Sequence, residues 1–353
     1  MAIQDASNPA ATAESPVRAR RRLPPELSIL GVMVGMMLLF EVLGWIFVGQ
    51  SFIANPLRLK IMILQEAEIG IIAVGVTQVI IMGGIDLSSG SVVGMTAMFA
   101  ASLAQEADYS HAIYPALTGL NPIFPVVAGL LGGLIIGLIN GSFIAYTKIP
   151  PFIATLGMML VNKGLALVVA GDKPIYFNDT EGFSTISQGS VIGYILPSVP
   201  VPNSVVILFV LAIGASLLLN RTALGRYTFA LGSNEEAVRL SGVNVDRWKI
   251  AIYMLAGAIC GIAGLLIASR LNSAQPALGQ GYELEAIAAV VIGGTSLSGG
   301  TGTVLGTIIG AFIMSVLTNG LRILSVPQEW QIVVTGVIII LAVYIDILRR
   351  RKL

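Results

Sequence analysis

Long apolar runs separated by short polar stretches make up most of the chain. Seven of these runs approach the roughly 20 residues that a helix needs to cross a bilayer, and they cover residues 27–48, 61–82, 123–146, 152–170, 203–219, 250–268 and 332–348. Three shorter runs end near Leu103, Ile292 and Leu317. We therefore expect an all-α integral membrane protein in which residues 27–348 form one transmembrane domain. The pattern predicts about ten transmembrane helices, some of them broken or re-entrant.

The composition restricts the class of protein further. Of the 353 residues, 55% are hydrophobic and 11% are charged, whereas soluble domains carry about 25% charged residues. A soluble globular fold is therefore excluded. The net charge of +1 gives no reason to expect a nucleic-acid partner. A single cysteine, Cys260, and a single histidine, His111, exclude a disulfide framework and a metal site built from these residues.

No arrangement of residues in the sequence indicates catalysis. We find no nucleophile paired with a base and no GxxxxGK[ST] loop, so the chain is not expected to bind ATP through a Walker A loop. We expect no catalytic residues, no metal and no cofactor, and hence a protein that is not an enzyme.

Basic residues predict how the chain crosses the membrane. Four arginines lie between residues 18 and 22, residues 349–353 form a basic tail, and the polar segment 221–249 carries five cations against three carboxylates. An excess of Lys and Arg marks cytoplasmic loops, so we expect both termini and this segment on the cytoplasmic side. An even number of spans agrees. The Ala-, Ser- and Pro-rich tail 1–26 is expected to be disordered.

Within the 221–249 segment we expect a short capped helix. Ser233 or Asn234 can cap it, acidic residues follow in the first turn, and a glycine ends it. The helix consists of Asn234, Glu235, Glu236, Ala237, Arg239, Leu240 and Gly242, and Ala237 and Leu240 share its apolar face. Two interpretations stay open on spacing alone. The helix docks onto a soluble partner, or it is an amphipathic linker that rests on lipid headgroups.

Glycines repeat at fixed intervals in two of the apolar runs. The first series is Gly129, Gly133, Gly137 and Gly141, and the second is Gly302, Gly306 and Gly310. A spacing of four places glycines on one helix face, where they allow a neighbouring helix to approach closely. We expect both series to be sites of helix packing.

Two similar polar turns interrupt the apolar pattern, GGIDLSSG at 83–90 and GGTSLSGG at 293–300. They share Gly, Gly, Leu, Ser and Gly in register, which predicts an internal duplication of the kind common in transporters. The sequence leaves the relative orientation of the repeats open. Irregular backbone at membrane depth is tolerated only where protein buries it or where it lines a water-filled cavity.

These turns supply most of the candidates for a translocation pathway, which are Asp86, Ser88, Lys163, Thr295, Ser296, Ser298 and Asn319. For Asp86 a simple capping role in the next helix is favoured over a pathway role. Lys163 lies deep in an apolar run, where ionisable residues are functional candidates. Four acidic residues, Glu66, Glu68, Glu283 and Glu285, are expected near an outer interface as parts of solvated helix starts.

Three motifs together resemble the permease subunits of ribose-type ABC sugar importers. These motifs are GGIDLSSGSVVG, ALGSNEEAVRLSGVNVDRWKI and RLNSAQPALGQGYELEAIAAVVIGGTSLSGG, and the similarity covers about residues 61–348. The resemblance implies a bacterial inner-membrane protein that works with ATP-hydrolysing subunits, a periplasmic sugar-binding protein, membrane lipid and a second permease subunit. A homodimer and a heterodimer both stay open. It also implies that the helix around Leu240 docks onto the ATPase as a coupling helix.

The substrate expected from these observations is a neutral monosaccharide or polyol, such as a ribose-like sugar or inositol. A stand-alone secondary sugar transporter is the alternative, with Lys163 and Asp86 carrying the coupling charge. A channel is disfavoured because the sequence shows no ring of like charges or aromatic constriction.

Overall fold

The computed structural model describes residues 25–107, 111–177, 182–195 and 201–350. The tail expected at 1–26 therefore lies almost entirely outside the described residues, and the first helix already begins at Pro25. At the other end the last helix continues to Arg350 and does not stop at 348.

Most of the described residues lie in helices. In the first half of the chain these are α1 (Pro25–Phe47), α2 (Pro56–Ile81), α3 (Ser89–Leu103), η1 (Pro115–Leu117), α4 (Ile123–Ser142), the π-helical turn η2 (Phe143–Thr147) and α5 (Pro151–Ala170). In the second half they are α6 (Thr185–Gln188), α7 (Val191–Ile195), α8 (Asn203–Arg221), α9 (Ala223–Leu240), α10 (Val245–Leu271), α11 (Tyr282–Ile292), α12 (Val304–Ile323) and α13 (Gln328–Arg350).

The all-α membrane architecture is confirmed, but the count of about ten transmembrane helices is not. Among the described residues, six helices are long and apolar enough to cross a membrane, namely α1, α4 with η2, α5, α8, α10 and α12. The expected third span, α3, has only 15 residues, and α11 has only 11. These two helices are short because each adjoins one of the two polar turns.

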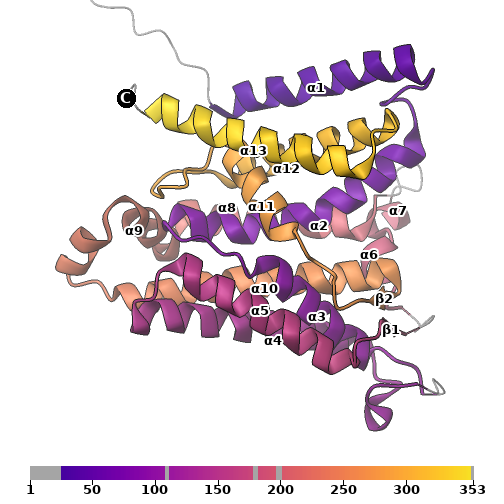
Figure 1. Ribbon diagram of the computed structural model, residues 1–353. Coiled ribbons are helices and arrows are strands. Elements are labelled where there is room, and N and C mark those ends of the chain that lie inside the picture. The colour runs from indigo at the N-terminus through magenta and orange to yellow at the C-terminus, as the bar shows by residue number, and fades with distance from the viewer. Residues whose placement is uncertain (1–24, 108–110, 178–181, 196–200, 351–353) are drawn as a thin grey trace, which may run out of the picture.

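A small β element stands where the sequence indicated only a polar loop between 171 and 202. Strand β1 (Ile175–Tyr176) pairs antiparallel with β2 (Ser273–Ala274), so that Ile175 lies opposite Ala274. The short helices α6 and α7 follow β1. Figure 1 shows this cluster at the end of the bundle away from α9, while the beginning of α1 and the C-terminus lie toward the same end as α9.

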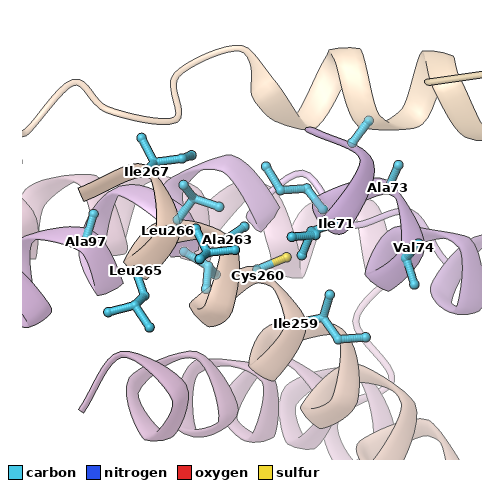
Figure 2. Packing of buried hydrophobic residues seen from close by; sticks show 14 of the residues in the cluster. Ile71, Ala73, Val74, Ala97, Ile259, Cys260, Ala263, Leu265, Leu266 and Ile267 are labelled. Atoms are coloured by element: carbon cyan, nitrogen blue, oxygen red, sulfur yellow. The ribbon is translucent and has the colours of Figure 1, made fainter. Parts of the chain in front are cut away.

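The centre of the molecule is the pair α2 and α10, with α3 and α11 beside them (Figure 1). Residues 71–74 of α2 and 263–268 of α10 are buried, and Figure 2 shows Ile71 of α2 beside Cys260 of α10. Helices α1, α4, α5 and α13 lie outside this core and expose apolar side chains such as Ile46 and Val168. Such an arrangement suits a protein whose outer surface faces hydrocarbon.

The first glycine series lies along the contact between α4 and α10. A Cβ atom on Gly133 would collide with the backbone of Gly257, and one on Gly137 would collide with the carbonyl of Tyr253. Because Gly257 in turn faces Gly137, the two helix backbones touch with no side chains between them.

The second series is interrupted at its start. Gly306 and Gly310 lie against the end of α11, where a Cβ would meet Gly293 and Ala289 respectively. Gly302 was expected to belong to the same helical ladder, but α12 begins only at Val304. Gly302 instead lies in the preceding turn against the side chain of Thr295. Thr303, whose side chain accepts a hydrogen bond from the Gly306 amide, fixes the later start of the helix.

Substituting Gly137 tests the α4–α10 contact. Gly137→Ala inserts a methyl group where the backbone of α10 already lies, and we expect a loss of about 1–3 kcal/mol from overpacking. The matched control is Gly132→Ala on the same helix, because a Cβ there would be 3.5 Å from Thr96 Cγ2, an ordinary contact. Thermal unfolding of the purified protein in detergent should separate the two variants, and equal midpoints would contradict this packing.

Candidate functional site

The two polar turns have the same backbone architecture. After α2, the amides of Gly83 and Gly84 donate to the carbonyls of Ile80 and Val79. After α11, the amides of Gly294 and Thr295 donate in the same way to Val291 and Val290. Each turn therefore ends its helix in a Schellman motif with a left-handed glycine, at φ +89° for Gly83 and +86° for Gly294.

This geometry corrects the register inferred from the sequence. The matching letters align Gly83 with Gly293, whereas the helix caps align Gly83 with Gly294. The segments after the caps also differ, since α3 begins at Ser89 and α12 begins only at Val304. A duplication stays a prediction, and the two turns correspond only over the helix ends.

The two turns touch each other and both touch α9. The amide of Gly300 donates to the carbonyl of Ile81 at 2.8 Å, so the second turn caps the end of α2. Gly232 of α9 fills the remaining space, because a Cβ there would overlap the Ile81 carbonyl and the Gly300 nitrogen. Gly299 packs against Gly83 and Gly232 from the other side. Three segments distant in the sequence thus meet mainly through backbone atoms.

Asp86 is buried in the first turn and acts as a local hydrogen-bond acceptor. Its Oδ1 accepts from the Ser88 amide at 2.8 Å and from the Ser88 hydroxyl at 2.6 Å, and Asn140 of α4 donates to that hydroxyl at 2.8 Å. Asp86 and Ser88 are 3% and 0% exposed. The carboxylate therefore organises the start of α3 and ties it to α4.

The candidates in the second turn lie in different environments. Thr295 and Ser296 are fully buried, and the Thr295 hydroxyl has no hydrogen-bond partner among the described residues. Ser298 is exposed, and its amide donates to the Ser296 hydroxyl. Thr295 and Ser296 thus support the fold of the turn, and only Ser298 is open to the surroundings.

The end of α9 contains the capped helix expected from the sequence. Asn234 has non-helical dihedral angles, φ −164° and ψ 96°, and its Oδ1 accepts from the Ala237 amide at 2.9 Å. Asn234, not Ser233, is therefore the cap, and the helix ends before Gly242 at φ +82°. Leu240 is 80% exposed. Among the other predicted members, Glu236, Ala237 and Arg239 are also exposed.

Glu235 fixes this helix to α10. Its carboxylate pairs with Lys249 at 2.7 Å and with Arg239 at 3.0 Å. Partial burial raises the pKa of Glu235, but the hydrogen bond and charge of Lys249, together with those of Arg239, lower it more, so the pKa lies below its usual range. Glu235 therefore has a structural role that the sequence did not reveal.

Lys163 lies apart from the turns, in a cavity of about 140 Å³ between α3, α5 and the loop before α11. Ser91, Gln280 and Glu283 line the same cavity. Lys163 itself is exposed on α5. Since a charge in the middle of an apolar span avoids lipid, it marks a surface that faces water or protein.

A second, more polar cavity of about 150 Å³ contains Asn319. Its remaining lining is Gln65, Glu66, Glu68, Ile69, Arg270, Tyr282, Glu285, Met314, Ser315, Thr318 and Arg322, which come from α2, α10, α11 and α12. The expectation that Glu66 and Glu68 lie at a solvated helix start is wrong, because they are 6% and 2% exposed. Arg270 holds Glu68 in a bidentate pair at 2.7 and 2.8 Å.

The predicted pathway residues therefore do not form one cluster. Asp86, Ser88, Thr295 and Ser296 belong to the joined turns, Lys163 lines one cavity and Asn319 lines another. One signal for the second cavity is present in the sequence. It is that Arg270 and Arg322, which were not among the sequence candidates, are charged residues close to the ends of long apolar runs. Within the described ranges no group of His, Cys, Asp and Glu side chains is arranged to hold a metal ion.

Short apolar helices next to glycine-containing turns, as at α2–α3 and α11–α12, are typical of membrane transporters. A family model described as the permease component of branched-chain amino acid transport systems matches residues 59–343. The chain belongs to this family, and among its members it is similar to monosaccharide ABC importer permeases.

Three relatives illustrate this similarity. The ribose import permease protein RbsC of Bacillus subtilis (strain 168) is 40% identical over 318 residues, which cover 90% of this chain and 92% of the relative. RbsC of Escherichia coli (strain K12) is 42% identical, over 80% and 84% of the two chains. The galactose/methyl galactoside import permease protein MglC of the same strain is 38% identical, over 90% and 94%. No solved structure matches the chain.

Replacing Asp86 tests its role in the first turn. Asp86→Ala leaves the buried Ser88 amide and hydroxyl without their acceptor, which costs about 1–3 kcal/mol per unsatisfied group. Asp86→Asn retains Oδ1 and should lose less. The measurement is the midpoint of thermal unfolding in detergent. An alanine variant as stable as the original protein would show that this acceptor does not organise the turn.

Proposed function

We propose that the protein is the membrane-spanning subunit of an ATP-binding-cassette importer that carries a neutral monosaccharide or polyol, such as a ribose-like sugar or inositol, across the bacterial inner membrane. ATP is hydrolysed on a partner ATPase, and a periplasmic sugar-binding protein delivers the substrate. The permease itself contributes no catalytic residue and needs no cofactor.

The observation that carries this proposal is the exposed helix 234–240 and its backbone contact with the two turns. Leu240 is a large apolar side chain that is 80% exposed at the end of this helix. The helix is attached to α10 by the ion pair between Glu235 and Lys249. Gly232, which lies between the two turns, is only four residues before Glu236 in the same helix α9. A force applied at Leu240 would therefore reach Ile81 and Gly300 directly. A resting place on lipid headgroups, the other interpretation of this helix, requires no such connection.

The proposed substrate follows from the chemistry of the polar positions. RbsC is named for ribose import and MglC for import of galactose or methyl galactoside, and all of these compounds are neutral polyhydroxylated molecules. Hydroxyl and amide groups line the second cavity together with three carboxylates and two guanidinium groups. We propose that Ser298, Lys163 and Asn319 face the pathway. The buried candidates do not touch the substrate but support the backbone of the turns that border the pathway; these are Asp86, Ser88, Thr295 and Ser296.

The proposed assembly contains two permease copies, in which both termini and helix 234–240 lie in the cytoplasm. The exposed apolar faces of α1, α4, α5 and α13 suit lipid and a second copy of the chain. The common position of α9, the start of α1 and the C-terminus at one end of the bundle supports this orientation (Figure 1).

A stand-alone secondary transporter is the alternative function. The exposed Lys163 favours it, because a charge at this position is able to carry coupling. Uptake of labelled D-ribose, D-galactose and myo-inositol in cells that express the complete transport operon distinguishes the two. We expect uptake that stops on ATP depletion. Uptake abolished by a protonophore but not by ATP depletion would favour the alternative, and import of an amino acid would contradict both.

Leu240 tests the proposed ATPase contact most directly. Leu240→Asp adds no charge to the bundle, since the side chain is exposed. At an interface it would remove a buried apolar side chain worth about 1.5–3 kcal/mol, so we expect ATPase binding at least tenfold weaker, which corresponds to ~1.4 kcal/mol. The measurement is co-purification of the ATPase with the permease, together with transport-stimulated ATP hydrolysis in liposomes.

The control for this test is Leu240→Met, which retains an apolar side chain of similar size and should keep ATPase binding. Glu235→Gln is unsuitable as a control because Glu235 pairs with Lys249 and Arg239. If Leu240→Asp inserts normally and retains both ATPase binding and stimulated hydrolysis, this helix is not the coupling element.

A further inference from the structure

The cavity around Glu66 is a polar feature separate from the contact between helix α9 and the two turns. It lies between the first half of α2, the C-terminal ends of α10 and α12, and the beginning of α11. Arg270 is 25 residues beyond the start of α10, which corresponds to roughly 37 Å of helix at ~1.5 Å per residue. Since α9 joins the start of α10, the cavity lies at the opposite end of the bundle from helix 234–240.

Glu66 is the unusual member of the cavity. It is 6% exposed, and its Oε1 is buried without a hydrogen-bond partner among the described residues. The hydroxyl of Ser315 lies beside the same carboxylate and interacts with it. A buried polar atom without a partner costs free energy, so native structures satisfy such atoms with protein, water or a ligand. The carboxylate therefore lacks one donor, and the cavity is where that donor would be placed.

The other charges in the cavity are already matched. Both carboxylate oxygens of Glu68 accept from Arg270 at 2.7 and 2.8 Å. Arg322 donates to Gln65 and lies within electrostatic range of Glu285. Glu66 is thus the one carboxylate of the described cavity lining without a basic partner.

This distribution of charge restricts the ligand. An anion would find no free basic group, because Arg270 is paired with Glu68 and Arg322 lies near Glu285. A cation at Glu66 would share the cavity with those two guanidinium groups. A neutral molecule with several hydroxyl groups meets neither objection, because each hydroxyl both donates and accepts hydrogen bonds. Glu66 would accept from one hydroxyl, while Asn319, Thr318 and Gln65 offer donors and acceptors to others. The half-buried ring of Tyr282 supplies an apolar wall for the C–H face of a sugar.

We infer that this cavity is an entry site that binds the hydroxyl groups of a sugar or polyol, with Glu66 as the principal acceptor and Asn319 as a second contact. The inference rests on the proposed function, because it names where the substrate of that function is first held. The cavity opens to the surface at Glu285 and Arg322, which are both exposed. A sugar released at this end of the bundle would therefore reach Glu66 without crossing the joined turns.

The test uses the complete transporter, which consists of permease, ATPase and binding protein, with labelled D-ribose and D-galactose as probes. Glu66→Gln keeps the shape of the side chain but replaces one acceptor oxygen with an NH2 group, which only donates. We expect the rate of uptake to fall at least tenfold while ATP hydrolysis by the complex stays within twofold of the original level. The control is Glu329→Gln, an exposed carboxylate in the first turn of α13 that does not line the cavity, and it should leave uptake unchanged.

A second measurement does not depend on turnover. Asn319→Cys introduces a thiol at the half-buried wall of the cavity, and the only other cysteine, Cys260, is buried. A small membrane-impermeant thiol reagent should label residue 319 from the outer side. D-ribose supplied with the binding protein should slow this labelling at least threefold. If Glu66→Gln fails to reach the membrane, the labelling of Asn319→Cys still tests whether the sugar binds in the cavity.

The proposal is overturned if Glu66→Gln transports at the original rate, or if labelling of Asn319→Cys is insensitive to D-ribose and D-galactose while the unmodified complex imports them. Failure of the proposed function itself looks different. In that case the unmodified complex imports none of these sugars, and the entry site is rejected with it before any variant is compared.

Discussion

The structure depends on the contact in which the Gly300 amide donates to the carbonyl of Ile81, with Gly232 filling the space beside it. A helix that ends inside a membrane protein leaves carbonyl groups that lipid cannot satisfy. Here the second polar turn supplies the missing donor for α2. The absence of side chains at Gly232 and Gly299 lets three backbones approach closely enough for this bond. The end of α2, the turn after α11 and the segment of α9 around Gly232 are therefore held together by direct contacts.

Glycine contacts hold the remainder of the bundle around this unit. The α4–α10 pair touches backbone to backbone at Gly133, Gly137 and Gly257, and α12 touches α11 at Gly306 and Gly310. Close backbone contact gives many weak dispersion interactions without the entropy cost of fixing side chains. The two cavities lie outside these contacts, one between α3, α5 and the loop before α11 and the other between α2, α10, α11 and α12.

Much of this arrangement could be predicted from local patterns. Apolar run length predicted most of the long helices, and the order Asn234, acidic turn, Gly242 predicted the capped helix, because these signals act within a few residues. The spacing of Gly129, Gly133, Gly137 and Gly141 indicated one packed helix face but gave no indication that α10 was its partner.

Features that depend on distant contacts could not be predicted. The register of the two turns was misjudged because identical letters in Gly-rich segments do not reveal which glycine is left-handed. Glu66 and Glu68 were mistaken for solvated residues because burial depends on α12 and on Arg270, which is 202 positions away from Glu68. Helix α12 starts later than expected because Thr303 caps it, and Gly302 lies in the preceding turn against Thr295. The glycine spacing alone did not indicate where the helix begins.

The central claim is that helix 234–240 drives the two turns through Gly232, and Gly232→Ala in the complete transporter tests it. The added methyl group would force the Ile81 carbonyl and the Gly300 amide apart while leaving the exposed surface around Leu240 unchanged. We predict that the ATPase still co-purifies in the original amount, while sugar uptake per ATP hydrolysed falls at least tenfold. If the variant retains both ATPase binding and the original ratio of uptake to hydrolysis, the contact at Gly232 does not couple helix 234–240 to the two turns.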